Sequence, residues 1–167
     1  MTVAGEVYHE QLSSGRTQAL FWALALTGLG VFGARWALAR VDGLALIGLA
    51  AFGVFLFYAL NYRTLVIRLT AAELRLTFGV FTWRVPLENV ADCQVDVLPA
   101  LLRYGGAGIH FMFVRGRYRA SFNFLEYPRV VVALRRPAGP VRDISFSTRR
   151  PAALCARLST ASAGAGV

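Results

Sequence analysis

Three arginines alternate with other residues in the segment Arg115-Gly116-Arg117-Tyr118-Arg119. On an extended strand, alternate side chains share one face and lie about 7 Å apart, so these guanidinium groups would form a row. Such a row can bind phosphate or lipid headgroups through paired hydrogen bonds, and the alternative is a strand face exposed to solvent. A second basic tip, on either side of a proline-containing turn, would consist of Arg135, Arg136 and Arg142.

Motifs for catalysis, metal binding or nucleotide binding are missing from the sequence. The glycine-rich segment Tyr104–Gly108 lacks both the GxGxxG and the P-loop spacing, and it is typical of a tight turn or bulge. His110 follows it, and we expect a surface or hydrogen-bonded histidine there. The other histidine, His9, precedes the apolar runs, so a histidine metal cluster cannot form, and a Cys93/His110 nucleophile pair is too slight a basis for catalysis. We expect no enzyme activity, no cofactor and no metal.

The overall composition also restricts the class of protein. Of the 167 residues, 56% are hydrophobic and only 16% are charged, against roughly 25% charged residues in an average soluble protein. This balance excludes a disordered chain, a collagen-like chain and an ordinary soluble enzyme. The two cysteines, Cys93 and Cys155, lie far apart and form no CxxC motif, which argues against a disulfide scaffold or a zinc module. We expect both thiols to be reduced and unpaired.

Two apolar runs without charge occupy residues 17–34 and 44–62. A membrane core needs roughly 20 helical residues, and the first run reaches residue 38 if Arg35 extends its side chain to the interface. Buried core helices and a cleavable signal peptide are the alternatives, but about 105 further residues are too few to enclose both helices, and the N-terminus is acidic. We therefore expect a transmembrane helical hairpin over residues 17–62, with spans at about 17–38 and 44–62, after an N-terminal tail at 1–16.

Arginine placement predicts the orientation of this hairpin. The short linker carries Arg35 and Arg40, and the opposite side carries more arginines near the spans. These are Arg16, Arg63, Arg68 and Arg75. The count, together with reduced cysteines, predicts an integral protein of the cytoplasmic (inner) membrane with two spans and both termini in the cytoplasm.

Small residues recur at intervals of three or four along the first span. Such a stripe lets two helices approach closely, and we expect packing within the hairpin, with contact between protomers as the alternative. Neither span contains an ionisable residue deep inside it, which argues against transport. The stripe consists of Ala19, Ala23, Thr27, Gly30 and Ala34.

After the apolar runs, the pattern changes to the alternation typical of β-strands. A terminal helix follows, with Ser147 or Thr148 as its cap and Pro151 in its first turn. About seven short strands and a closing helix predict a barrel or sandwich, and we expect a flexible tail at 161–167. The strands are expected at residues 65–69, 74–78, 81–85, 93–97, 109–122, 129–135 and 141–146.

Several short segments of residues 63–160 are similar to those of bacterial pleckstrin-homology-like domains, of the kind found in small membrane proteins. The resemblance implies a seven-stranded, strongly bent barrel with a C-terminal helix, frequent assembly into rings or larger oligomers, and no catalysis. The chain departs from the family pattern at His110, where an arginine is expected. The similar segments are Leu69-Thr70-Ala71-Ala72-Glu73-Leu74, Phe78-Gly79, Arg84-Val85-Pro86-Leu87-Glu88-Asn89-Val90, Tyr104-Gly105-Gly106-Ala107-Gly108-Ile109, Val130-Val131-Val132-Ala133-Leu134 and Phe146-Ser147-Thr148-Arg149-Arg150-Pro151.

Charge is distributed unevenly between the two parts of the chain. Residues 63–167 hold fifteen of the 18 basic residues and six of the nine acidic ones, which accounts for the whole net charge of +9. We expect a non-catalytic, membrane-anchored adaptor or assembly module that binds a membrane protein partner or copies of itself. The alternative is recognition of anionic lipid in the bilayer by the arginine-rich strand. An enzyme or transporter is a remote alternative, and nucleic acid is not expected because no recognition motif is visible.

Overall fold

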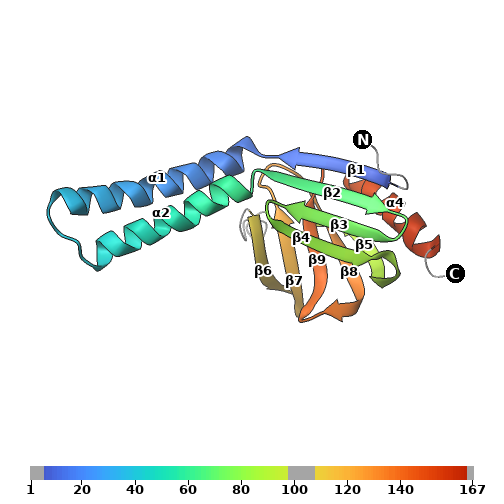
Figure 1. The fold of residues 1–167 in the computed structure, drawn as a ribbon. Helices are drawn as coiled ribbons and strands as arrows, with labels where there is room; N and C mark the ends of the chain where they lie inside the picture. Colours follow the sequence, from blue (N-terminus) through green and yellow to red (C-terminus); the bar gives the residue numbers. More distant parts are fainter. Residues whose placement is uncertain (1–5, 98–107, 165–167) are drawn as a thin grey trace.

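A computed structural model describes residues 6–97 and 108–164 of the chain (Figure 1). Helices α1 (Gly15–Ala37) and α2 (Gly43–Asn61) form a hairpin that projects from a β-rich part, against which helix α4 (Pro151–Gly164) packs. The strands form two sheets, here called sheet A and sheet B. Sheet A contains β1 (Glu6–Ser13), β2 (Thr64–Thr70), β3 (Glu73–Phe78) and β4 (Phe81–Pro86). Sheet B contains β5 (Val90–Val95), β6 (Gly108–Val114), β7 (Arg117–Asn123), β8 (Arg129–Ala138) and β9 (Val141–Ser147).

Local caps determine where the two long helices begin. The Ser14 hydroxyl accepts a hydrogen bond from the backbone N–H of Thr17 at 3.0 Å, which satisfies one free donor at the start of α1. Asp42 caps α2 in the same way, because its carboxylate accepts from the N–H of Ala45 at 3.2 Å. Asp42 also forms an ion pair with Arg35, which closes the short turn between the helices. The bounds of both helices agree with the predicted spans to within two residues.

Both helices are long and apolar enough to cross a membrane. They contain 23 and 19 residues, and only 22% and 17% of their most apolar 18-residue windows are buried inside the protein. The core helices of a soluble protein would be mostly buried, whereas these leave most of their apolar side chains uncovered. The alternative of buried core helices therefore does not fit this structure.

The two helices touch through glycines rather than through the predicted stripe. A Cβ atom on Gly28 would lie 2.8 Å from the carbonyl oxygen of Gly48, so only glycine permits this close approach. The buried positions of α1 are Thr17, Phe21, Ala25 and Gly28. The predicted stripe was wrong because it follows an adjacent face of the helix. Its members Ala19, Ala23, Thr27, Gly30 and Ala34 are exposed.

Sheet A is an antiparallel meander in which each strand pairs with the next one along the chain. Its strands β2, β3 and β4 confirm the predictions for residues 65–69, 74–78 and 81–85. Strand β1 corrects the prediction of an N-terminal tail at 1–16, because residues 6–13 pair with β2. This pairing was not predicted because a single edge strand carries a weak alternation pattern.

Sheet B has the order β5-β8-β9-β7-β6, and its β7 and β9 run parallel. The described residues thus form nine strands in two sheets rather than a closed barrel of about seven. The stretch predicted as one strand at 109–122 is a hairpin, because Arg115 and Gly116 turn the chain with φ angles of 51° and 77°. At the C-terminus, residues 161–164 belong to α4, which corrects part of the predicted tail at 161–167.

The core lies between the inner faces of the two sheets and extends to the base of the helix hairpin. Trp83 of sheet A meets Phe122 of sheet B with ring centroids 6.1 Å apart. Leu154 and Leu158 of α4 are fully buried in the same core. Tyr62, which directly follows α2, stacks on Phe78 of β3 at 4.9 Å. This contact joins the hairpin to the β-rich part.

The two cysteines form a disulfide, so the prediction of unpaired thiols was wrong. Cys93 of β5 and Cys155 of α4 have Cα atoms 5.2 Å apart, although 62 positions separate them in sequence. Their spacing along the chain gave no sign of this proximity, because it arises only when α4 packs against β5. The disulfide therefore fastens the terminal helix to the edge strand of sheet B.

We expect loss of this disulfide to lower the free energy of unfolding of the β-rich part. A cross-link that closes a loop of this length stabilises a protein by about 4 kcal/mol in the chain-entropy model, so Cys155→Ser should lower the denaturation midpoint. Chemical unfolding of the purified full chain in detergent, with and without reductant, measures the effect. Reductant should destabilise the wild type and leave Cys155→Ser unchanged. Equal stability of the wild type in both conditions would contradict this prediction.

Candidate anion-binding surface

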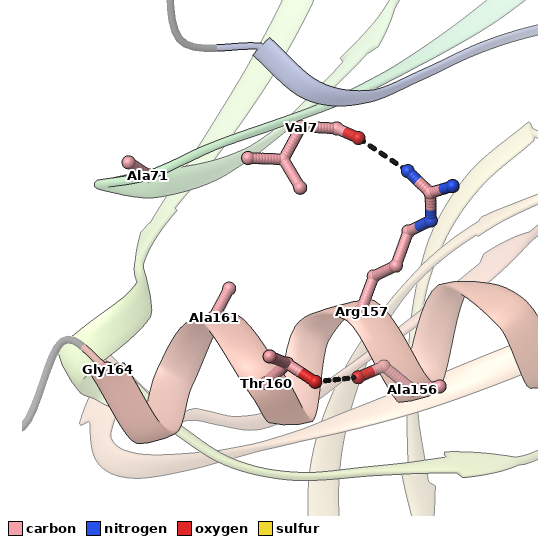
Figure 2. A pocket seen from close by; sticks show the side chains of 7 residues that line it. All are labelled: Val7, Ala71, Ala156, Arg157, Thr160, Ala161 and Gly164. Atoms are coloured by element: carbon pink, nitrogen blue, oxygen red, sulfur yellow. Dashed lines mark hydrogen bonds between the residues drawn. The ribbon is translucent and has the colours of Figure 1, made fainter.

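A groove of about 640 Å³ lies between α4 and sheet A, but its walls offer little chemistry (Figure 2). Its lining is mostly apolar or small, and its charged residue, Arg157, is already engaged. The Arg157 Nη1 atom donates to the carbonyl oxygen of Val7 at 2.6 Å, and the guanidinium lies 5.6 Å from the centre of the Tyr8 ring. The Thr160 hydroxyl donates to the carbonyl oxygen of Ala156 at 3.0 Å, and the lining residues provide no acid–base pair.

The outer face of sheet A carries a basic side chain from each of its four strands. The register pairs His9 with Arg68, Arg68 with Arg75, and Arg75 with Arg84. Neighbouring strands lie about 4.8 Å apart, so these four residues extend over about 14 Å across the sheet. We call His9, Arg68, Arg75 and Arg84 the basic row.

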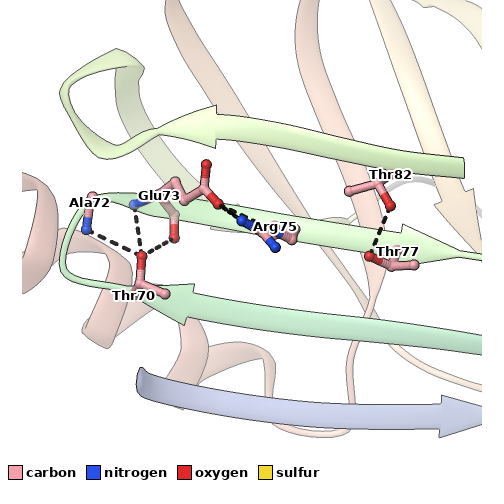
Figure 3. A network of polar contacts seen from close by, with 6 residues as sticks. All are labelled: Thr70, Ala72, Glu73, Arg75, Thr77 and Thr82. Carbon is pink, nitrogen blue, oxygen red and sulfur yellow. Dashed lines mark hydrogen bonds and ion pairs between the residues drawn. The ribbon is translucent and has the colours of Figure 1, made fainter. Parts of the chain in front are cut away.

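Two short hairpins align the arginines of the basic row. Two residues connect β2 to β3, and two residues connect β3 to β4, and loops of this length fix the register of a hairpin. At the first hairpin, the Thr70 hydroxyl accepts from the N–H groups of Ala72 and Glu73 at 3.3 and 3.1 Å (Figure 3). Because alternate residues face opposite sides, the buried leucines of β2 and β3 direct the arginines outward.

The positive charge of the basic row is only partly neutralised. Glu73 binds Arg75, with its Oε1 atom 2.5 Å from Nη2 and 2.9 Å from Nε (Figure 3). Within residues 6–97 and 108–164, neither Arg68 nor Arg84 makes an ion pair or a side-chain hydrogen bond. Like charges directly opposite each other on neighbouring strands destabilise a sheet. An anion bound here would relieve that repulsion.

A shallow depression of about 250 Å³ accompanies the row. The hydroxyl groups of Thr77 and Thr82 face each other there at 3.2 Å (Figure 3). Guanidinium groups bind carboxylate or phosphate oxygens in a bidentate manner, and hydroxyl groups can add further hydrogen bonds. The lining residues are Val66, Arg68, Arg75, Thr77, Thr82 and Arg84.

The predicted arginine row at 115–119 is not a row of free guanidinium groups. Arg115 lies in the β6–β7 turn rather than on a strand. Arg117 Nε donates to Asp143 Oδ1 at 2.8 Å, and this hydrogen bond raises the pKa of Arg117. Arg119 is buried, with its guanidinium nitrogens 3.8 Å from an oxygen of Asp96 and 3.7 Å from one of Asp143. The sequence prediction missed these carboxylates because Asp143 lies on β9 and Asp96 directly follows β5, both far from β7 in sequence.

The second predicted basic tip is exposed but lies on a different sheet from the basic row. Arg135 and Arg136 are in β8 and Arg142 is in β9. The Arg135 Nε atom donates to the carbonyl oxygen of Val90 at 3.0 Å, while the backbone N–H of Arg136 donates to the side chain of Asn89. The structure therefore does not combine these arginines with the basic row into one surface.

His110 and the glycine-rich segment show no sign of a metal or nucleotide site. His110 lies opposite Ser121 in sheet B, and burial, with a smaller effect from Arg129, lowers its pKa. Of the segment Tyr104–Gly108, residues 104–107 lie outside the described residues, and Gly108 has a φ of 92°. Among the described residues, no group of three histidine, cysteine, aspartate or glutamate side chains could hold a metal ion.

Comparison with models of known protein families gives no match, and comparison with curated proteins gives none either. The basic row was accessible to sequence reasoning in part, because its arginines are the polar positions of alternating strands. What was missing was the register that places them side by side.

We expect the double variant Arg68→Gln/Arg84→Gln to be more stable than the wild type at low salt. Removing like charges from directly opposed positions gains roughly 0.2–1 kcal/mol per pair, and the gain should shrink as salt screens the charges. Urea unfolding of the full chain in detergent at two salt concentrations measures this difference. Arg136→Gln/Arg142→Gln, in sheet B, is the matched control. A destabilised double variant at low salt would count against the repulsion argument.

Proposed function

We propose that the protein is a non-catalytic, membrane-anchored module that binds an acidic segment of a partner protein through the basic row. The observation that carries this proposal is the alignment of three arginines on adjacent strands against one carboxylate, Glu73. Such an arrangement is unfavourable in the free protein and becomes favourable when an anionic ligand covers it. The flat outer face of a sheet suits an extended protein segment.

The distance of the row from the helices favours a protein partner over lipid. Strand β2 begins at Thr64, directly after the hairpin, and sheet A extends away from the helices (Figure 1). Arg68 is four residues further along, which corresponds to about 13 Å of extended chain. The electrostatic influence of a charged bilayer falls off over about 8–10 Å at physiological ionic strength. A partner segment reaches the row more readily than a headgroup does.

Four further parts of the sequence prediction belong to this proposal. We propose that α1 and α2 span the cytoplasmic membrane, which is supported by their length, their apolar composition and their low burial. The similarity to a pleckstrin-homology-like domain also remains a proposal, compatible with two sheets followed by a C-terminal helix. Lipid binding by the arginines of 115–119 ranks second, because Arg117 and Arg119 already have carboxylate partners. Self-association remains an alternative for the partner.

Binding of a fluorescent hexaglutamate peptide to the full chain in nanodiscs tests the basic row. In neutral phosphatidylcholine nanodiscs, we expect salt-sensitive binding that weakens at least tenfold in Arg68→Gln/Arg84→Gln, because two of the three arginines are lost. The control Arg136→Gln/Arg142→Gln should bind within twofold of the wild type. Fluorescence anisotropy measures both affinities.

The same assay distinguishes the alternatives. Equal weakening in both double variants would overturn the proposal, because the peptide would then respond only to total charge. Nanodiscs that contain the anionic lipid phosphatidylglycerol test the lipid alternative. If anionic lipid displaces the peptide and Arg115→Gln/Arg117→Gln/Arg119→Gln abolishes this competition, the lipid alternative gains support. A salt-resistant mass of several protomers, measured by light scattering, would instead support self-association.

The disulfide favours a membrane orientation opposite to the one predicted from sequence. Disulfides persist in oxidising compartments, so we propose that the β-rich part lies on the non-cytoplasmic side and the short linker lies in the cytoplasm. The number of arginines on each side of the spans is only weak evidence against this orientation. Arg68 and Arg75 belong to strands of the β-rich part, and whole domains are translocated largely regardless of their charge. Arg16 and Arg63 then balance the two linker arginines, Arg35 and Arg40.

Reporter fusions after Val167 should reveal this orientation. Alkaline phosphatase folds only after export, because it needs disulfides, whereas green fluorescent protein exported unfolded stays dark. We expect an active phosphatase fusion and a dark fluorescent fusion in intact cells. Fusions of the same reporters within the linker, after Ala39, should give the reverse pattern. If the C-terminal green fluorescent protein fusion is fluorescent and the C-terminal phosphatase fusion is inactive, both termini lie in the cytoplasm and the proposed orientation is wrong.

A further inference from the structure

Exposed apolar side chains gather where the helix hairpin meets the β-rich part. Val80 lies in the β3–β4 turn, Phe81 is the first residue of β4 and Leu125 lies in the β7–β8 loop, with exposed fractions of 71%, 45% and 38%. Single exposed apolar residues are ordinary on a protein surface, but these come from two separate connections. We call these three residues the apolar rim.

The β3–β4 turn lies against the end of α2. A Cβ atom on Gly79 would lie 2.1 Å from the carbonyl oxygen of Asn61, so the backbone of the turn touches the last residue of the helix. The ring of Phe81 lies 6.3 Å from that of Tyr62, which directly follows the helix. Val80, between Gly79 and Phe81, is thus held beside the end of the second apolar helix.

The β7–β8 loop lies against the start of α1. The backbone N–H of Arg16 donates to Glu126 Oε1 at 2.8 Å, and the N–H of Leu125 donates to the Thr17 hydroxyl at 3.4 Å. The rim therefore touches both helices at the same end of the hairpin, one connection at each helix. Figure 1 shows this end as the junction between the helices and the sheets.

We propose that the apolar rim inserts into the interfacial layer of the bilayer that α1 and α2 cross. The inference rests on the membrane-spanning part of the proposed function. The argument for lipid is continuity, because Leu60 and Leu20 are exposed near the same ends of the helices as the rim. On the α2 side, the exposed apolar surface thus reaches from Leu60 to Val80 and Phe81, whereas on the α1 side Leu125 lies next to the charged pair of Arg16 and Glu126. The exposed aromatic ring of Phe81 suits the interface.

Insertion at two connections would limit how the β-rich part can swing on the hairpin. The β-rich part is already connected to α1 through β1 and to α2 through β2, and insertion beside both helices would further fix its tilt relative to the bilayer. The outer face of sheet A, with its basic row, would then be held at a constant height above the lipid.

Quenching of tryptophan fluorescence by brominated lipid tests this inference in the full chain. Trp22→Phe/Trp36→Phe removes the helix tryptophans and leaves the core residue Trp83, and Val80→Trp then adds a reporter to the rim. The matched control is Val7→Trp, at a position of similar type that is 43% exposed and lies on β1, about 26 Å of extended chain from the start of α1. In bilayers brominated near the headgroups, we expect quenching at Val80→Trp to exceed that at Val7→Trp at least twofold.

The wild-type chain, here called the parent, contains Trp22 and Trp36 and distinguishes the two ways in which this experiment could fail. If Trp22 and Trp36 of the parent are quenched but Val80→Trp is quenched no more than Val7→Trp, the rim does not enter the bilayer and the membrane span stands. If the parent tryptophans are not quenched either, the span and the inference both fail. Should Val80→Trp not fold, as judged by circular dichroism, Leu125→Trp provides the same measurement at the other connection.

Discussion

The contact between the end of α2 and β3 determines the placement of everything else in this protein. Tyr62 stacks on Phe78 at 4.9 Å, and the neighbouring Gly79 allows the β3–β4 turn to touch the backbone of Asn61. The aromatic stack extends the hydrophobic core to the base of the hairpin, and a side chain at position 79 would push the turn away. Sheet A is therefore joined rigidly to the helices, and it extends away from them (Figure 1). The distance of the basic row from the helix hairpin follows from this joint.

The register of sheet A explains why a stable sheet carries opposed positive charges. Two-residue connections fix the pairing of β2, β3 and β4, and the buried leucines on the inner face prevent a slip by one residue. The arginines consequently lie opposite one another, although this arrangement is unfavourable in the free sheet. Locally unfavourable arrangements of this kind are typical of functional surfaces. Here the opposed arginines lie on the outer face of sheet A, which no other described element covers.

In sheet B, by contrast, two arginines lie next to carboxylates. Asp96 and Asp143 lie close to Arg119, and Asp143 also binds Arg117, so much of the positive charge of this sheet is used within the domain. The disulfide at the other edge of the sheet fastens α4 to β5 and adds stability without further charge. The two sheets thus differ: sheet B pairs Arg117 and Arg119 with its own carboxylates, whereas on sheet A neither Arg68 nor Arg84 makes an ion pair within the described residues.

The sequence by itself determined the features that depend on neighbouring residues along the chain. Uncharged runs at 17–34 and 44–62 indicated the two helices, and alternation indicated β2, β3 and β4, because helix and strand periodicity are local properties. Only the tertiary structure decided the pairing of Cys93 with Cys155, the addition of β1 to sheet A, and the choice of which arginines meet carboxylates. These depend on contacts between residues far apart in the chain. Arg117 and Arg68 look alike in sequence, and packing alone gives one of them a carboxylate partner and leaves the other exposed.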